Sequence, residues 1–584
     1  MDRSSVVRFA LIAIAVIVFL KFGMPAITGS NDKVQQLPEE KYINAPAFVP
    51  DAIDPPTDGH ANTPQDGELC KIAGNRFDAE LSSRGAAITH FRLHGYDRID
   101  LSTTPDQERW RSLRTLFRGP EGDNQIKYDR FPWALERMPN DTGCTFTYAD
   151  DLVRIVKKVT AGTRPFELEV ETSVTNLAAD PKKHQLTIGV YAYREARDMK
   201  GSMGRVPPFQ TDLTCAAGKE VVRKTKGDFA AGWVGVPSTD RFAAVSSHYF
   251  TQALIPSPGG PLPRCEILAE DWTVAGQPHD SDEAVTIFHA KLVFPGKELA
   301  PNESTTYKQT AYFGAKERPV LQAAAGGHAK LGDTISLGTF SFSAVVTVLV
   351  SVLSFLHDKV TFGNWGVAII LMTIALRLLL FPLTLKSIKT TIAMRKLKPE
   401  VDSLNAKFAD DAQAKNLAMM ELWKKHGVNP FGGCLPQLVQ MPVWFAMYTT
   451  LQTAVEMYHT RFLWFSDLSA PDRYFILPAA LCGLMIAQQR LMPQQGMDPM
   501  QQKMMAWGMP LIFGAMMLFL PAALGVYMMT NSLLGIGQQL AVEKLAPRGP
   551  SNEITVKQVS KPTDKTSKSS RPPAGELGKG KARV

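Results

Sequence analysis

Residues 365–385 read WGVAIILMTIALRLLLFPLTL, and Arg377 is the single charged residue among these 21. A helix rises ~1.5 Å per residue, so about 20 apolar residues cross a bilayer core of ~30 Å. Asp, Glu, Lys and Arg are absent from residues 431–455, 474–489 and 504–542. The last stretch has 39 residues with Pro521 near its middle, which predicts two spans joined as a hairpin. The C-terminal half therefore contains five predicted spans, and a single-domain soluble enzyme is excluded.

The average composition conceals this uneven distribution of charge. The chain has 584 residues, with 64 Lys+Arg, 56 Asp+Glu and a net charge of +8, and its mean hydropathy is −0.08. Nine basic residues lie in residues 386–430 and ten in residues 541–584, against two in residues 456–473. Because loops rich in Lys and Arg stay in the cytoplasm, both basic segments are predicted to be cytoplasmic.

The N-terminus carries a further apolar segment, residues 9–20, which follows Arg3 and Arg8. A cleaved signal peptide and a retained anchor both fit this pattern. The anchor is favoured, because no small-x-small cleavage site follows and Lys21 can extend its ammonium group to the lipid headgroups. In either case, the chain that follows is predicted to be exported.

The exported part has the alternating pattern of β-strands from about residue 69 to residue 319. Residues 166–174, 186–193 and 285–294 each present one apolar face and lie between turn-rich segments. Roughly 250 residues of such strands predict an antiparallel β-sandwich. Its carboxylates and histidines are scattered, so binding or scaffolding is a better prediction than catalysis.

Residues 334–357 also lack Asp, Glu, Lys and Arg, but a span here would place the basic loop at 386–430 outside the cell. Small polar residues recur along this stretch at a spacing of three or four, which places them on one helical face. They are Ser343, Thr347, Ser351 and Ser354, followed by Asp358. The pattern predicts an amphipathic helix that lies in the outer membrane interface.

The basic loop predicts two antiparallel helices with a turn at residues 409–411. Pro399 marks a kink or a new helix start, and Gly427 ends the second helix. Two interpretations of this basic hairpin remain open: it contacts RNA or lipid phosphate, or its basic face is only solvated. The tail beyond Pro547 has no apolar periodicity and is predicted to be disordered, with anionic lipid or ribosomal RNA as its candidate ligands.

The fold class predicted is a multi-domain membrane protein, with a five-helix core, an N-terminal anchor helix and a large antiparallel β-sandwich. The predicted segments are an N-terminal transmembrane anchor (1–29), a flexible tether (30–68), a periplasmic β-sandwich (69–330), an amphipathic interfacial helix (334–358), a second transmembrane helix (363–385), a cytoplasmic helical hairpin (386–428), four further transmembrane helices (431–455, 474–491, 504–519 and 521–542) and a basic cytoplasmic tail (543–584).

Six cysteines divide between the two parts of the chain. Cys70, Cys144, Cys215 and Cys265 lie in the exported part, whereas Cys434 and Cys482 lie in predicted spans. Neither a C-x-x-C motif nor a Cys/His pattern with metal-ligand spacing is present. An exported compartment permits disulfides among the first four, and free buried thiols are the alternative.

Arg377 is the thirteenth residue of its 21-residue stretch and is therefore predicted to lie near the middle of the membrane. An arginine there costs ~2.5–3.5 kcal/mol on insertion scales and usually faces a bundle interior or a hydrated cavity. The predicted spans offer no acidic partner, so water, chloride, a lipid headgroup or a transient ligand would balance the charge. A purely structural arginine, bonded to carbonyls and glutamines, is the alternative. Further polar residues in the spans suggest a hydrated groove: Thr373, Gln437, Gln440, Asn531, Gln538 and Gln539.

These residues fall within motifs that resemble the YidC-type membrane protein insertases of the Oxa superfamily. The resemblance extends over about 180 residues with the motifs in the family's order. The predicted anchor and exported β domain are similar to those of Gram-negative members with a large periplasmic domain. The motifs are Trp365-Gly366, Arg377, Phe381-Pro382-Leu383-Thr384, Val428-Asn429-Pro430-Phe431-Gly432-Gly433-Cys434-Leu435-Pro436, Gln440-Met441-Pro442, Asp467-Leu468-Ser469, Asp498-Pro499-Met500-Gln501-Gln502-Lys503 and Asn531-Ser532.

The resemblance implies an insertase and chaperone, not an enzyme, whose groove opens to the cytosol and to lipid. Where relatives often carry an aromatic pair, this chain has Tyr527-Met528, so only Tyr527 is carried over. The implied partners are nascent membrane proteins, the Sec translocon with its accessory subunits, the ribosome and membrane lipids. The implied location is the bacterial inner membrane, with both termini cytoplasmic. The implied substrate-contacting residues are Arg377, Thr373, Cys434, Pro436, Gln440, Met441, Pro442, Tyr527 and Asn531.

Other classes of function make different demands on the sequence. A transporter or channel, the main alternative, predicts paired ionisable residues near mid-membrane and an inverted internal repeat, and neither is visible. An anchored exported enzyme predicts a convergent pair of acids in the β domain. No Walker motif occurs, and no cofactor or metal is predicted.

Overall fold

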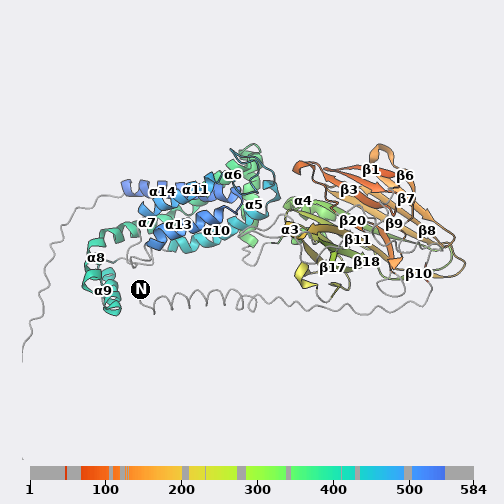
Figure 1. Cartoon of the computed structure of the whole chain (residues 1–584), viewed down its shortest axis with the longest axis horizontal. Helices are drawn as coiled ribbons and strands as arrows, with labels where there is room; N and C mark the ends of the chain where they lie inside the picture. Colours follow the sequence, from red (N-terminus) through yellow and green to blue (C-terminus); the bar gives the residue numbers. More distant parts are fainter. Residues whose placement is uncertain are drawn as a thin grey trace, which may run out of the picture.

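The computed structural model describes residues 47–48, 67–103, 110–118, 125–126, 128, 131–199, 210–229, 232–272, 285–336, 343–408, 411–427, 435–491 and 503–545. These residues form a β domain and a helical body (Figure 1). The predicted anchor, most of the predicted tether, residues 546–584 of the predicted tail, and Cys434 lie outside the described residues.

Two large antiparallel sheets build the β domain, which confirms the antiparallel β architecture predicted from the alternating segments. The nine-stranded sheet has the order β13 (Glu220–Thr225), β12 (Asp212–Ala217), β15 (Phe242–Ser246), β16 (Phe250–Pro256), β20 (Ser304–Ala315), β9 (Glu167–Asn176), β8 (Val153–Ala161), β7 (Gly143–Ala149), β6 (Ala134–Arg137). The six-stranded sheet has the order β14 (Val234–Val236), β17 (Arg264–Trp272), β18 (Val285–Val293), β11 (Leu186–Glu195), β4 (Thr115–Arg118), β5 (Gln125–Ile126).

Smaller elements complete this domain. The strands β1 (Leu69–Gly74), β2 (Phe77–Ser82) and β3 (Ala87–Leu93) form a three-stranded sheet, and β10 (Lys182–His184) pairs with β19 (Lys297–Leu299). The helix α4 (Arg318–Ala323) follows β20, the longest strand, and the short helix α3 (Ala196–Met199) follows β11.

The alternation of buried and exposed residues holds for β9 but not for β18. All nine residues of β18 are buried, as are the first seven of β11, its neighbour in the middle of the six-stranded sheet. One reason is a second apolar cluster, which contains Trp110 and Tyr191 together with Val285 and Ile287. The prediction of a single apolar face was therefore wrong for β18, because both of its faces are covered.

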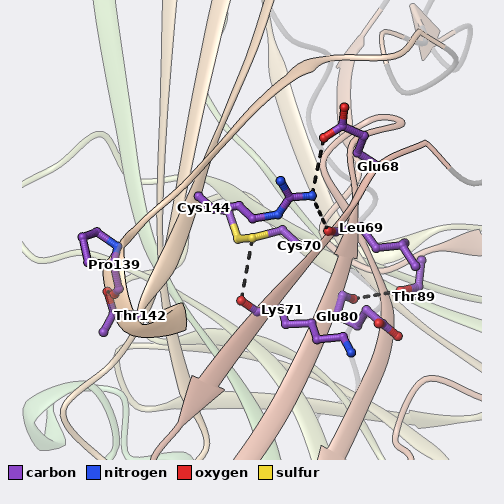
Figure 2. Close-up of a disulfide and its surroundings, with 10 residues drawn as sticks. Glu68, Leu69, Cys70, Lys71, Glu80, Thr89, Pro139, Thr142 and Cys144 are labelled. Carbon is purple, nitrogen blue, oxygen red and sulfur yellow. Dashed lines mark hydrogen bonds and ion pairs between the residues drawn. A yellow bond between two sulfur atoms is a disulfide. The ribbon is translucent and has the colours of Figure 1, made fainter.

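Two disulfides stabilise the β domain, so the alternative of free thiols was wrong for these four cysteines. Cys70–Cys144 joins β1 to β7 (Figure 2), and Cys215–Cys265 joins β12 of the nine-stranded sheet to β17 of the six-stranded sheet. Cys482 is the free cysteine of the described residues and lies in the helical body.

Acidification between pH 6.5 and 4 is expected to destabilise the β domain through His184. Burial, reinforced by the charge of Lys297, lowers the pKa of His184 to about 4 from its ordinary 6.5. Within this window the unfolded chain binds a proton that the folded chain does not, so stability is full above pH 6.5 and falls toward pH 4. The slope is ~1.4 kcal/mol per pH unit for one such histidine.

Urea denaturation of the full chain at several pH values measures this slope. His184→Gln removes the titrating group and keeps a polar partner for the Tyr307 hydroxyl, which lies 2.9 Å from His184 Nε2. The variant is expected to show a shallower pH dependence than the wild type. An identical slope in both proteins would contradict the assignment to His184.

The helical body begins with α5 (Ser343–Phe355), which ends in a π-helical turn (Leu356–Val360). Its other helices are α6 (Trp365–Leu379), α7 (Phe381–Lys396), α8 (Lys398–Lys407), α9 (Ala412–Lys425), α10 (Leu435–Thr453), α11 (Ile476–Leu491), α13 (Met509–Met517) after a π-helical turn (Met504–Gly508), and α14 (Ala522–Leu545). Side chains of Asn364 and Asp411 cap α6 and α9 by accepting bonds from backbone N–H groups of their first turns.

Several predicted boundaries differ from the observed ones. Residues 331–334 form a 3₁₀ turn, and α5, which corresponds to the helix predicted at 334–358, begins at Ser343. The predicted helix at 363–385 is divided at Leu380, and its last residues belong to α7, because Pro382 fits only the first turn of a new helix. Within the residues described, no helix is both long enough and apolar enough to cross a membrane.

The predicted hairpin (386–428) begins too early, because residues 386–396 belong to α7. Its remaining part forms α8 and α9, at the end of the helical body farthest from the β domain (Figure 1). Pro399 lies in the first turn of α8, and Gly427 has the positive φ of 62° that favours glycine just beyond the end of α9. Val401, Met419 and Leu422 form the apolar contact between the two helices.

Candidate functional site

Arg377 lies in the last turn of α6 and reaches across to α14. Its Nε donates to the side-chain oxygen of Asn531 at 2.7 Å, and one terminal nitrogen donates to the Asn531 carbonyl at 2.7 Å. The other terminal nitrogen donates to Oε1 of Gln538 at 3.3 Å. All three acceptors are neutral, so they orient the guanidinium without cancelling its charge.

Within the described part of the chain, no carboxylate forms an ion pair with Arg377. The absence of an acidic partner from the predicted spans agrees with this. In the structure, the oxygens that accept hydrogen bonds from Arg377 are two side-chain amide oxygens and one backbone carbonyl. This arrangement matches the alternative prediction of an arginine bonded to carbonyls and glutamines. Because a half-buried charge is screened less than one in water, its field remains strong at this site.

A glycine of α14 provides the space for the guanidinium. A Cβ atom added at Gly535 would lie 3.0 Å from a terminal nitrogen of Arg377 and 3.6 Å from Nε2 of Gln488. Gln488 belongs to α11, so three helices meet at this point. Gly535 follows Asn531 by one turn and faces the same side of α14.

A second polar contact lies one turn earlier on α14. The side-chain nitrogen of Gln440, on α10, donates to the hydroxyl oxygen of Tyr527 at 3.3 Å. Tyr527 is buried and precedes Asn531 by four residues, so both lie on one face of α14. The polar row on this face is therefore Tyr527, Asn531 and Gln538, approached by α10, α6 and α11.

Thr373 does not take part in this network. Thr373 is buried, and its hydroxyl donates to the Ile369 carbonyl at 2.7 Å within α6. Pro436, Met441 and Pro442 lie on α10, and Cys434 lies outside the described residues.

Two residues of the site were missed as candidates, Gln488 and Gly535. A sequence signal existed for each. Gln488 and Gln489 end an apolar run, and Gly535 follows Asn531 at the helical spacing of four. The sequence identifies Gln538 as a polar residue of the last predicted span, and the structure adds its role as an acceptor for Arg377.

Comparison with known proteins assigns both parts of the chain. The family model described as 60Kd inner membrane protein matches residues 355–548, and the model of the YidC periplasmic domain matches residues 69–348. A crystal structure titled as an active YidC insertase with the first transmembrane domain resolved covers 82% of this chain and 95% of its own. Its sequence identity is 16% and its TM-score 0.35.

Curated relatives are similar over most of their length. A membrane protein insertase YidC from Anaeromyxobacter sp. (strain K) is 34% identical over 517 residues, which cover 83% of this chain and 86% of the relative. Another, from Nitratidesulfovibrio vulgaris (strain DSM 19637 / Miyazaki F), is 30% identical over 501 residues, covering 82% and 86%. The two family models and this extended identity agree with one another, and the chain belongs to the YidC family of membrane protein insertases.

Proposed function

We propose that this chain inserts newly made proteins into the inner membrane through a hydrated groove centred on Arg377, alone or with the Sec translocon. The observation that carries the proposal is the arginine held by neutral acceptors of a single neighbouring helix. Those bonds fix the position of a positive charge and leave it attractive to an acidic or polar segment of a substrate. A structural ion pair would instead neutralise it.

The proposed mechanism has three steps. A polar outer segment of the substrate enters from the cytosol and is attracted by Arg377. The substrate's apolar helix then slides along the surrounding helices toward lipid. Burial of its ~20 apolar residues supplies the free energy, at about 25 cal/mol per Å² of apolar surface. Gln440, Tyr527 and Asn531 would offer hydrogen bonds to the polar segment during its passage.

The proposed topology places the β domain in the periplasm and both termini in the cytoplasm. The α8–α9 hairpin lies at the opposite end of the helical body from the β domain, as this topology requires (Figure 1). Leu417 and Met420 are among the exposed side chains of α9, at 65% and 63%. We propose that this face receives the substrate, and that the basic hairpin and tail bind the ribosome and anionic lipid.

Depletion of the protein, followed by supply of wild-type chain, tests the proposed function. Insertion of a small single-span substrate with an acidic outer segment is expected to stop on depletion and to return with the wild type. Solute flux is measured in parallel. Insertion that continues in depleted cells, together with a loss of flux, would contradict the insertase and favour a transporter or channel.

Gly535→Ala is expected to reduce insertion about threefold and to leave the stability of the chain unchanged or slightly raised. The added methyl group displaces the guanidinium by a few tenths of an ångström, and alanine is about 1 kcal/mol more favourable than glycine in a helix. Gly537→Ala is the matched control, because no atom lies within 4 Å of its added Cβ. Equal insertion by the two variants would contradict a role for the guanidinium position.

A further inference from the structure

The C-terminal end of α10 is contacted by the β domain. A helix leaves its last four carbonyls without partners inside the helix. His248 Nε2, between β15 and β16, lies 2.8 Å from one of these, the Gln452 carbonyl. Arg318, the first residue of α4, donates to the Thr453 hydroxyl oxygen at 3.4 Å. Both contacting side chains belong to the β domain, and both contacted residues belong to the helical body.

The chemistry of these two side chains suits a helix C-terminus. A carbonyl only accepts, so the His248 ring must carry its proton on Nε2 and donate. Burial lowers the pKa of His248 to about 4, so the ring is neutral at physiological pH. Arg318 places a positive charge beside the negative end of the α10 dipole, an arrangement that stabilises helices.

The chain beyond α10 continues into the β domain. Val455 is fully buried in the apolar core of that domain. The ring of Tyr458 packs against Tyr249 and Phe250, at centroid distances of 5.4 and 5.6 Å. His459 forms an ion pair with Asp97 when its ring is protonated. The cap on α10 is thus part of an extended junction between the domains.

The other end of α10 belongs to the candidate site. Gln440 precedes Gln452 by twelve residues, or ~18 Å along a helix, and its side chain bonds Tyr527. Tyr527 precedes by one turn the Asn531 that holds Arg377. A continuous helix therefore links the β-domain junction to the polar row around the arginine, and a change in its tilt at one end moves Gln440 at the other.

We infer that the β domain supplies the C-terminal cap of α10, and that His248 and Arg318 are positioning residues that hold the groove in its insertion-competent arrangement. The inference rests on the proposed function and gives the β domain a role beyond scaffolding. Neither residue touches the site itself. Their effect on insertion passes through α10.

The test uses the full chain in membranes and two measurements on each variant. The variants are Arg318→Ala, His248→Phe, Arg318→Lys as the conservative replacement, and Arg137→Ala as the matched control. Arg137 lies on the edge strand β6 and bonds Glu68 and the Leu69 carbonyl, away from the junction. Hydrogen exchange is measured for amides of residues 449–458, and insertion is measured with the single-span substrate.

Arg318→Ala and His248→Phe are expected to raise exchange in residues 449–458 about tenfold and to lower insertion several-fold, with resistance of the β domain to proteolysis unchanged. Arg318→Lys retains the charge, so its exchange in residues 449–458 and its insertion are expected to lie close to those of the wild type. Arg137→Ala is expected to match the wild type in both measurements. Unchanged exchange in Arg318→Ala would contradict the inference that the β domain caps α10, whatever the insertion rate. Raised exchange together with full insertion would contradict the inference that the cap on α10 holds the groove in its insertion-competent arrangement. A wild type that inserts nothing refutes the proposed function instead, and the exchange measurement then still tests the cap.

Discussion

Replacing Arg377 with alanine is expected to reduce insertion of a substrate with an acidic outer segment at least about tenfold, the equivalent of ~1.4 kcal/mol. The variant loses the positive charge and leaves the Asn531 side chain and carbonyl without the donor they now bind. Arg377→Lys keeps the charge but not the forked geometry. It is therefore expected to retain most of the activity.

Insertion in depleted cells, with each variant supplied at equal membrane abundance, measures this difference. Arg490→Ala is the matched control, because Arg490 lies in the same helical body and packs over the ring of Trp507, 5.9 Å from its centroid. Equal loss in the Lys and Ala variants would point to the guanidinium as a structural element and contradict the role of its charge. Full activity of Arg377→Ala would contradict the proposed groove.

The position of Arg377 could be predicted from the sequence, whereas its partners could not. A charge in an apolar run is visible without any fold. The acceptors Asn531 and Gln538 lie 154 and 161 residues further along the chain, and only the packing of α14 against α6 brings them near. Local patterns carry no information about that packing, so the candidate acceptors stayed an unordered set of polar residues.

Helix boundaries illustrate a second limit. No charged residue lies between Leu379 and Leu383, so the apolar pattern of residues 365–385 predicts one helix. The break at Leu380 follows from backbone chemistry, because Pro382 has no N–H to bond the carbonyl four residues earlier. Pro521 has the same effect and separates α13 from α14. Pro382 is therefore the sequence signal for the break near Leu380, and hydropathy is not.

In the β domain, the strands were easier to predict than their environment. Alternation identifies a strand, but burial of both faces depends on residues elsewhere, such as Trp110, that cover the outer face of the sheet. Cysteine pairing also depends on residues that are far apart in the sequence. Four cysteines allow three pairings, and the arrangement of the strands selects Cys70–Cys144 and Cys215–Cys265.

Removing the Cys215–Cys265 disulfide is expected to lower the free energy of unfolding of the β domain by about 4 kcal/mol, from the chain-entropy relation for two cysteines 50 residues apart. The bond joins β12 of one large sheet to β17 of the other, so its loss removes a covalent link between the two sheets. The Cys215→Ala/Cys265→Ala double variant, studied by urea denaturation of the full chain, measures the change, and treatment of the wild type with a reductant should lower stability in the same direction.

Cys482→Ala, which removes the free cysteine of α11, is the control. A double variant as stable as the control would contradict the stabilising role of the disulfide. A loss well above this value would indicate that the two sheets depend on the bond for their native packing.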